Sequence, residues 1–320
     1  MFHRTIVCLF AAFAVAVLAS FLATIGWPLD LLAHFQAQYV LVGLLFATGF
    51  AIFRNWNRAA MAVCLSLVAL VRMDVFDDGR FAATSGTVEP ATSVVTANLF
   101  GSAAALDDLV EENRARGFDL MILTELPVPA DDRLLDRFKG MLHVAGVPGQ
   151  ALFGRPAAVI LSRTAPRSVE LIPVGRNPNA ITKAVYCGGQ AEPCLSVFAV
   201  HTLPPLTPHF YLAQADILQR LATEVSQTPG PVLVAGDMNA TSWAPLLAGF
   251  QETARMRKAV CGSRWTPTWL APVPGIGLEL DHFFVGNGLA VKNCEPGDFN
   301  GSDHWPVFAE FALAEQEPSD

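Results

Sequence analysis

Residues 232–239 read VLVAGDMN, an apolar run that passes directly into Gly, Asp and Asn. A second stretch, SDHWP at residues 302–306, stands beside another apolar run. Each places a carboxylate next to an amide or an imidazole at the end of a predicted strand. Ligand sites of α/β sheets gather at strand ends, because the loops there present side chains on a rigid base. The two stretches therefore indicate a hydrolytic metal site at the edge of a sheet.

From Ser93 onward, strand-like and helix-like segments alternate. The predicted strands are Ser93–Ala97, Leu120–Thr124, Ala157–Ser162, Leu195–Val200, Val232–Ala235, His282–Val285 and Val307–Phe311. The predicted helices are Ala103–Arg116, Asp131–Phe138 and Leu212–Gln227. This alternation favours a single α/β domain over residues 93–314, followed by a short tail over 315–320.

The N-terminal part of the chain is much more apolar than the rest. The whole sequence is 52% hydrophobic with a mean hydropathy of +0.39, and most of the excess lies before about residue 75. Apolar runs cover Thr5–Ile25, Leu31–Phe53 and Ala59–Val71. Because about 20 apolar residues cross a bilayer as a helix, we expect a membrane anchor of about three transmembrane helices over residues 1–76. A polar linker follows over 77–92.

Two alternatives to this anchor are open. The first run could be a cleaved signal peptide, and the short third run could be a soluble or interfacial helix. The positive charges predict the orientation, since Arg4, Arg54 and Arg58 flank the runs while residues 26–38 contain no Lys or Arg. The positive-inside rule then places the N-terminus in the cytoplasm. Three spans would leave the α/β domain on the far side of the membrane, whereas two would leave it in the cytoplasm.

Charge and cysteine usage narrow the function. From Phe81 onward there are 16 Lys and Arg against 25 Asp and Glu, a net charge of −9 with His neutral. Duplex-binding proteins usually carry a basic stripe, so this balance argues against a dedicated nuclease. Cys187 and Cys194 bracket a turn-rich connector and could form a disulfide in an oxidising compartment, which leaves Cys261 and Cys294 as a second pair. Four unrelated buried thiols are the alternative. No zinc-type Cys or Cys/His spacing appears.

Polar residues stand at or just past the ends of the predicted strands. They are Asn98, Glu125, His201, Asp237, Asn239, Asp281, Asp303 and His304. Carboxylate and amide oxygens suit Mg²⁺ or Mn²⁺, and imidazole beside carboxylate suits proton transfer. Taken singly, each has a structural alternative, such as a turn cap, an Asx turn or a buried core histidine. Their order along the chain favours a site.

That order resembles the endonuclease/exonuclease/phosphatase superfamily, which includes DNase I-like nucleases, abasic-site nucleases, sphingomyelinases and inositol polyphosphate phosphatases. The resemblance covers about Ser93–Leu313. The blocks that carry it are Ala97-Asn98-Leu99, Leu123-Thr124-Glu125, Ile160-Leu161-Ser162-Arg163, Val200-His201-Thr202, Gly236-Asp237-Met238-Asn239, Leu280-Asp281-His282-Phe283 and Ser302-Asp303-His304-Trp305-Pro306-Val307. The resemblance implies a DNase I-like sandwich of two β-sheets flanked by helices. With its apolar N-terminus, the chain looks like bacterial inner-membrane members of the superfamily, whose catalytic domain we expect in the periplasm.

The resemblance also implies a metal shell. Glu125 would be the principal ligand of Mg²⁺ or Mn²⁺, with Asn98 and Asp303 completing or approaching the shell.

The remaining residues would act on the substrate. Asp237 would position or deprotonate the attacking water, and Asn239 would hold the phosphate or that water. His304, oriented by Asp281, would contact the scissile phosphate, and His201 would contact it from another side. Whether the general base is Asp237 or the His304–Asp281 pair is left open.

The expected function is a membrane-anchored, divalent-metal-dependent phosphoesterase that hydrolyses a phosphodiester. The substrate could be lipid-linked, a small molecule or a nucleic acid, and the missing basic stripe favours the first two. A DNase- or RNase-type nuclease and a non-catalytic membrane-tethered scaffold are the alternatives. No protein partner is implied.

Overall fold

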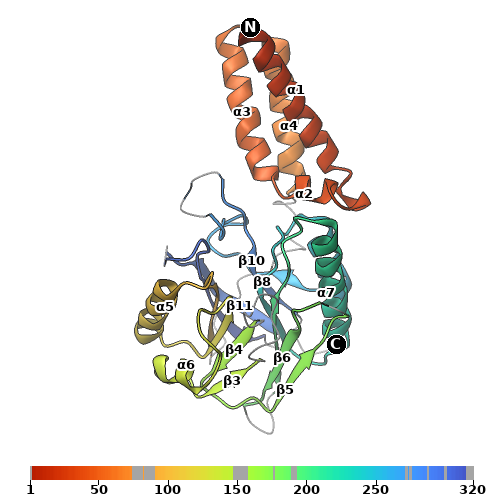
Figure 1. Ribbon diagram of the computed structural model, residues 1–320. Coiled ribbons are helices and arrows are strands. Elements are labelled where there is room, and N and C mark those ends of the chain that lie inside the picture. The colour runs from red at the N-terminus through yellow and green to blue at the C-terminus, as the bar shows by residue number, and fades with distance from the viewer. Residues whose placement is uncertain are drawn as a thin grey trace.

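Two stacked β-sheets form the body of the protein (Figure 1). The computed structural model describes residues 2–73, 82, 91–146, 158–175, 177–188, 193–270, 273, 276–286, 288–298 and 301–314. Within these residues each sheet has six strands, and helices cover the outer faces. The predicted two-sheet α/β sandwich is confirmed. Most of the predicted linker over 77–92, and the whole tail over 315–320, fall outside the described residues.

The elements follow one another along the chain in this order. The helices are α1 (Phe2–Ser20), the 3-10 turn η1 (Ala23–Ile25), α2 (Leu29–Ala33), α3 (Gln36–Ile52), α4 (Trp56–Arg72), α5 (Ala103–Arg116), α6 (Asp132–Arg137), α7 (Pro208–Gln227) and α8 (Pro245–Ala254). The strands are β1 (Thr92–Asn98), β2 (Leu120–Thr124), β3 (His143–Ala145), β4 (Val159–Ser162), β5 (Ser168–Ile172), β6 (Ile181–Tyr186), β7 (Leu195–His201), β8 (Val232–Asp237), β9 (Arg257–Lys258), β10 (Asp281–Val285), β11 (Leu289–Pro296) and β12 (Val307–Leu313).

The strand order places polar strand ends beside one another. The sheets run β11-β12-β1-β2-β4-β3 and β5-β6-β7-β8-β10-β9. β1 is parallel to β2, and β7 is parallel to β8, so His201 pairs with Asp237 at the end of the second pair. β10 runs antiparallel to β8 and begins at that same edge, where Asp281 pairs with Asp237. The register thus gathers residues that are far apart in sequence.

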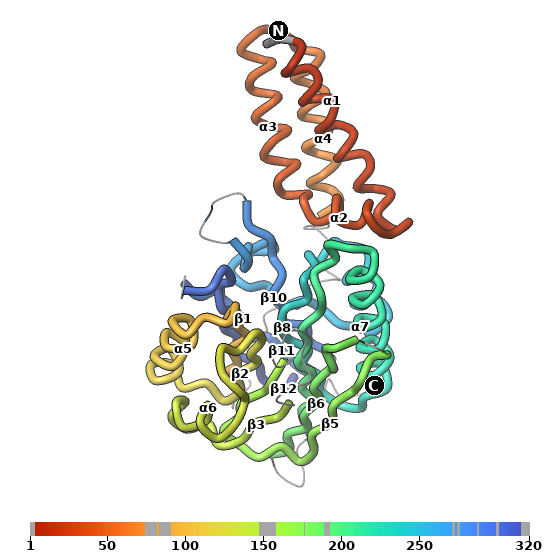
Figure 2. The backbone as a smooth tube through the Cα atoms, in the orientation of Figure 1, coloured from red at the N-terminus to blue at the C-terminus, as the bar shows by residue number. Residues whose placement is uncertain are grey.

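Apolar side chains fill three layers of the sandwich. One cluster joins the two sheets and includes the fully buried Ile122, Ile160, Leu233 and Phe283. Two further clusters lie under the outer helices. Helices α5 and α6 lie on one side of the paired sheets and α7 lies on the other (Figure 2). Removing this apolar area from water is the main stabilising term of such a domain.

Local sequence signals explain where the helices begin and end. The Ser102 side chain accepts a hydrogen bond from the Ala105 N–H at the start of α5, and Gly117 ends that helix at φ 72°. Helix α7 begins earlier than predicted, because Thr207 caps it and Pro208 occupies its first turn. The prediction missed α8 and the strands β3, β5, β9 and β11, and it gave no bounds for β6. Of these, β5 has an exposed first half and shows no apolar run for a sequence pattern to detect.

The N-terminal helices form a separate bundle at one end of the sandwich (Figure 1). α1, α3 and α4 pack around an apolar cluster that contains Phe10, Val17 and Phe50. In the described part of the chain, no helix has both the length and the apolar character needed to cross a bilayer. α3 and α4 have 17 residues each, or about 25 Å at 1.5 Å per residue, against a hydrocarbon core of about 30 Å. The predicted three transmembrane helices are therefore unsupported.

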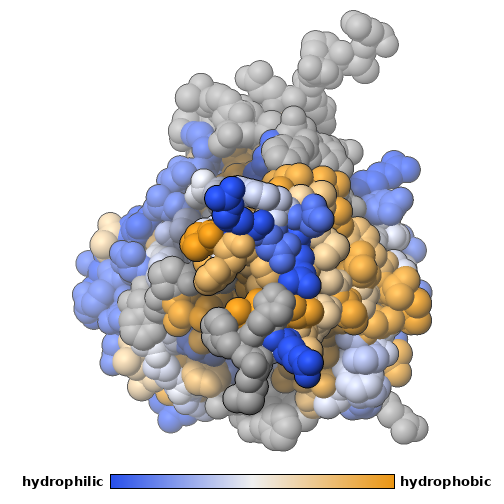
Figure 3. Space-filling model, turned by 90° about the horizontal axis from the view of Figure 1, so that it is seen from above, coloured by the Kyte–Doolittle hydropathy of each residue, from blue (hydrophilic) through white to orange (hydrophobic). Residues whose placement is uncertain are grey.

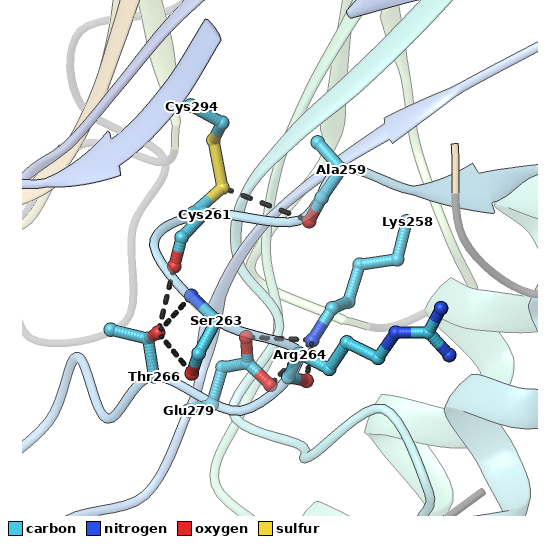
Figure 4. The surroundings of a disulfide bond; sticks show 8 residues. All are labelled: Lys258, Ala259, Cys261, Ser263, Arg264, Thr266, Glu279 and Cys294. Atoms are coloured by element: carbon cyan, nitrogen blue, oxygen red, sulfur yellow. Dashed lines mark hydrogen bonds and ion pairs between the residues drawn. A yellow bond between two sulfur atoms is a disulfide. The ribbon is translucent and has the colours of Figure 1, made fainter. Parts of the chain in front are cut away.

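Two disulfides stabilise the loops of the sandwich. Cys187 bonds to Cys194, and Cys261 bonds to Cys294, so of the two alternatives left open by the sequence the structure has the disulfides. The second disulfide joins the segment after β9 to β11, next to a buried ion pair of Lys258 and Glu279 (Figure 4).

Candidate active site

The GDMN stretch forms a tight turn at the end of β8. Gly236 has φ 136°, and a Cβ there would lie 2.0 Å from the Val200 carbonyl oxygen, so only glycine fits. Asp237 is 1% exposed. Its Oδ1 accepts a hydrogen bond from the Asn239 N–H at 2.8 Å, and its Oδ2 accepts one from Asn239 Nδ2 at 3.2 Å. The turn thereby fixes the carboxylate at the strand end.

Asn98 connects this carboxylate to the other sheet. Its Nδ2 donates to Asp237 Oδ2 at 2.8 Å and to Glu125 Oε1 at 3.2 Å. Its Oδ1 accepts from the Phe100 N–H at 2.9 Å. Asn98 therefore presents its amide nitrogen to the two carboxylates. Glu125 itself has φ 49°, a left-handed conformation that costs free energy in a residue with a Cβ and must be held by its surroundings.

His201 lies between the same two carboxylates. Its Nε2 is 3.7 Å from both Glu125 Oε1 and Asp237 Oδ2. The backbone of this strand end is held by Asn179, whose Nδ2 donates to the His201 carbonyl at 2.8 Å. His201 can therefore contact an anion bound beside Glu125 and Asp237.

His304 and Asp281 form a buried pair on the opposite side of Asp237. His304 Nδ1 lies 2.7 Å from Asp281 Oδ2, while His304 Nε2 lies 4.0 Å from Asp237 Oδ2. Ser302 holds this block in place, because its Oγ donates to the Asn98 carbonyl and accepts from the His304 N–H. The free edge of the imidazole consequently faces Asp237.

Burial and neighbouring charges shift the pKa values of Asp237, Asp281 and His304. Burial by itself lowers the pKa of His304, but the carboxylates of Asp281 and Asp237 outweigh it and raise that pKa to about 10. Burial raises the pKa of Asp237, and the nearby Asp281 carboxylate raises it further. For Asp281, burial opposes ionisation, but the charge and hydrogen bond of His304 keep the pKa below its usual value. At neutral pH the site therefore contains an imidazolium–carboxylate pair.

The side-chain chemistry fits a divalent cation. Asp237, Asp281 and His304 each offer a ligand atom, and these atoms lie within 4.8 Å of one another. The Oδ1 atoms of Asp281 and Asp303 are buried and accept no hydrogen bond within the described residues. Leaving buried carboxylate oxygens unpartnered is costly, and a hard cation with oxygen ligands would relieve that cost.

All eight predicted residues come together at one cavity of about 720 Å³. Its polar wall contains Glu125, His201, Asp237, Asn239, Asp303 and His304. Asn98 and Asp281 stand directly behind these residues and hold them through the hydrogen bonds described above.

The sequence prediction missed several residues that shape the site. Leu31, His34 and Phe35 line the cavity although they belong to the N-terminal segment. Trp269, which the sequence offered either as part of an apolar wall near the site or as a core residue, lines the cavity, and its Nε1 donates to Asp303 Oδ2 at 3.0 Å. Thr268 Oγ1 accepts from the backbone N–H of Asp281 at 3.0 Å. The N-terminal residues gave no signal because they lie in or beside runs that look like membrane segments.

Comparison with known proteins agrees with this geometry. A model of the Endonuclease/Exonuclease/phosphatase family matches residues 95–304. A "UPF0294 protein" from Vibrio campbellii (strain ATCC BAA-1116) is 30% identical over 108 residues, which are 33% of this chain. That match spans only 35% of the Vibrio protein.

Solved structures show the same fold at low sequence identity. A protein described as endonuclease/exonuclease/phosphatase from Beutenbergia cavernae matches with a TM-score of 0.58 and 17% identity, over 70% of this chain and 72% of that one. A humanized D. rerio TDP2 matches with a TM-score of 0.56 and 16% identity, over 70% and 99%. The human Nocturnin catalytic domain with bound sulfate matches with a TM-score of 0.54 and 16% identity, over 72% and 97%.

Proposed function

Because the chain belongs to the endonuclease/exonuclease/phosphatase family, we propose that it is a divalent-metal-dependent hydrolase that cleaves a phosphodiester by direct attack of water. The arrangement of His304 carries this proposal. Its imidazole is paired with Asp281 and faces the Asp237 carboxylate at 4.0 Å, in a cavity that also contains Glu125 and His201. A general acid and a general base thus stand on one wall.

Proton transfer can be assigned to these two groups. Asp237 takes a proton from the attacking water, whose oxygen bonds to phosphorus, and its raised pKa makes it a stronger base than an ordinary carboxylate. The bond from phosphorus to one ester oxygen breaks, and that oxygen receives the proton from His304 Nε2. The products are an alcohol and a phosphate monoester. Asp281 keeps the imidazole charged and oriented.

The cation would be held mainly by Glu125 and Asp303. Metal ligands must be deprotonated, and at neutral pH the raised pKa of His304 keeps a proton on its Nε2, so His304 is a poor ligand. Asn98 positions Glu125 through its 3.2 Å hydrogen bond; direct ligation through its Oδ1 would require the amide to turn toward the cavity. When bound, Mg²⁺ or Mn²⁺ would neutralise charge on the phosphoryl oxygens. Asn239 and His201 would hold the remaining phosphoryl oxygens.

Turnover of bis-p-nitrophenyl phosphate by the purified full chain tests this function. We expect hydrolysis with Mg²⁺ or Mn²⁺ and none with EDTA. Glu125→Gln and His304→Ala should each abolish turnover, whereas the controls Glu252→Gln and His143→Ala, which lie away from the cavity, should not. Failure of the wild-type protein to hydrolyse the diester or to bind either metal in calorimetry would leave the scaffold alternative. Plasmid DNA in the same assay tests the nuclease alternative.

The location of the protein is also a proposal. We infer that the N-terminal bundle holds the enzyme at a bacterial inner membrane, with the hydrolase domain in the periplasm. Support comes from apolar side chains exposed on α3 and α4, among them Leu45 at 73% and Val71 at 69%. The two disulfides also suit an oxidising compartment. A topology reporter fused after Gly79 should be active in the periplasm, and activity confined to the cytoplasm would overturn this placement.

A further inference from the structure

Apolar side chains also line the cavity that contains the polar catalytic groups. This apolar wall consists of Phe100, Leu203, Leu206, Phe210, Leu278 and Leu280. Leu206 is 66% exposed and Phe100 is 55% exposed, so the apolar wall continues to the outer rim. Exposed apolar patches on soluble domains mark binding sites more often than chance surface. We therefore expect an apolar part of a ligand to bind against this wall.

The N-terminal segment completes this apolar wall. Leu31 and Phe35, which lie far from the catalytic residues in sequence, line the same cavity. Both flank His34, whose Nδ1 accepts a hydrogen bond from the Thr241 N–H at 3.2 Å in the loop that follows Asn239. Trp243 Nε1 donates to the Ala33 carbonyl at 3.0 Å. These buried anchors fix the two apolar side chains next to the catalytic loop.

The charges of the residues that line the cavity argue against a polynucleotide as its occupant. The described residues that line the cavity include no Lys or Arg. Its charged groups are carboxylates and the histidines of the catalytic wall. A polynucleotide would need cations along its backbone beyond the scissile phosphate, because phosphate neutralisation supplies much of its affinity. An uncharged, apolar arm on the phosphate would instead remove the apolar wall from water.

We propose that the substrate is an amphiphile, a phosphate diester with one long alkyl or polyprenyl arm that lies between Leu31, Phe35 and the apolar wall. This proposal rests on the proposed hydrolase function and adds the class of substrate. The apolar surface extends from the rim toward the base of the bundle, where Leu22 is 51% exposed and Ile25 is 73% exposed. Seen from above, hydrophobic surface alternates with hydrophilic surface on the face that the view presents (Figure 3). Apolar side chains are thus exposed both at the cavity rim and at the base of the bundle.

A series of p-nitrophenyl alkyl phosphates tests the substrate class. The ethyl, butyl and octyl diesters share one leaving group, so differences in kcat/KM report binding of the arm. The full chain is assayed in one fixed detergent, with each substrate kept below the concentration at which it forms micelles. Under these conditions kcat/KM should rise by about tenfold or more from the ethyl to the octyl ester, because each buried methylene adds favourable transfer free energy. The same preparation is assayed with bis-p-nitrophenyl phosphate to establish that the enzyme is active.

Two variants and a matched control test which side chains cause the preference for the octyl ester. Leu206→Asn and Leu31→Asn should each reduce the octyl-to-ethyl ratio of kcat/KM by about fivefold or more, and Leu31→Asn tests the contribution of the N-terminal segment. Leu142 is as exposed as Leu206, at 65%, but does not line the cavity, so Leu142→Asn should leave the ratio unchanged.

The outcomes separate this inference from the proposed function. Hydrolysis of the ethyl and bis-p-nitrophenyl esters without a gain for the octyl ester would overturn the amphiphilic substrate and keep the hydrolase. A gain that survives both cavity variants would place the arm elsewhere and would equally overturn the proposal. Absence of any hydrolysis would overturn the proposed function itself.

Discussion

His304 Nδ1 lies 2.7 Å from Asp281 Oδ2, and this contact joins the two sheets of the sandwich. His304 comes just before β12 in one sheet, and Asp281 opens β10 in the other. Both side chains are buried, so the charge of each is stabilised chiefly by its partner. The contact therefore fixes the direction of the imidazole and its protonation at the same time.

The stability of the metal-free protein should depend on this contact between pH 6.5 and about 10. The pKa of His304 rises from about 6.5 in an unfolded chain to about 10 in the fold. A raised pKa contributes stability that is complete below pH 6.5 and is lost as the pH rises through the folded pKa. In EDTA, the unfolding free energy should fall over this range, and His304→Gln should flatten the fall. An equally steep fall in the variant would contradict the assignment.

Asp281→Asn should reduce kcat rather than binding. The amide cannot stabilise the imidazolium, so His304 loses its proton near neutral pH and no longer serves as the acid. Loss of general acid catalysis typically costs about 10²–10⁴-fold in rate. Steady-state kinetics should show this loss in kcat with little change in KM, and a shift of the alkaline limb to lower pH. Asp216→Asn, on the exposed side of α7, is the control. If Asp281 had a purely structural role, the pH dependence of kcat would be the same in the variant as in the wild type.

Mn²⁺ binding should distinguish the two possible sets of metal ligands. If Glu125 and Asp303 hold the cation, calorimetry of Glu125→Gln should show affinity lowered by about tenfold or more, since such ligands are bound as carboxylates. Asp281→Asn should then bind Mn²⁺ nearly as well as the wild type. The reverse result would assign the cation to the cluster of Asp237, Asp281 and His304.

The two disulfides should contribute unequally to stability. They close chain segments with sequence separations of 33 and 7 residues. On the loop-entropy account, losing the longer closure costs about 4 kcal/mol and losing the shorter one about 2 kcal/mol. Cys261→Ser/Cys294→Ser should therefore lower the unfolding midpoint more than Cys187→Ser/Cys194→Ser does in chemical denaturation. Equal effects would show that loop closure does not dominate.

Replacing only one partner of the buried ion pair beside the Cys261–Cys294 disulfide should cost much stability (Figure 4). Lys258 Nζ lies 2.6 Å from both carboxylate oxygens of Glu279, and both side chains are buried. Lys258→Met strands a buried carboxylate, so we expect a loss of about 3–5 kcal/mol. The double variant Lys258→Met/Glu279→Leu should recover much of that loss in the same denaturation experiment. A double variant as unstable as the single one would contradict this account.

Local sequence patterns predicted most of the sandwich, and the eight polar residues that they singled out lie together at one cavity. Apolar runs such as residues 232–235 report strands because both faces of those strands are buried. Edge strands such as β5 escaped prediction, because half of their side chains face solvent. The helices α1, α3 and α4 were expected from their apolar runs, but their predicted role as membrane spans rested on run length, and α1 and α3 are shorter than their runs.

The sequence by itself determined which chemical groups are present and how their nearest neighbours fold. Ser102 and Gly117 show this, since they begin and end α5 through hydrogen bonds to residues of the same helix. Only the tertiary structure decided that Asn98 presents its nitrogen to Asp237 and Glu125, that His304 is charged, and that Leu31 and Phe35 line the catalytic cavity. These properties depend on burial and on contacts between residues as far apart in sequence as Leu31 and His304. Such contacts are set by strand register and by the packing of whole elements, which local periodicity does not encode.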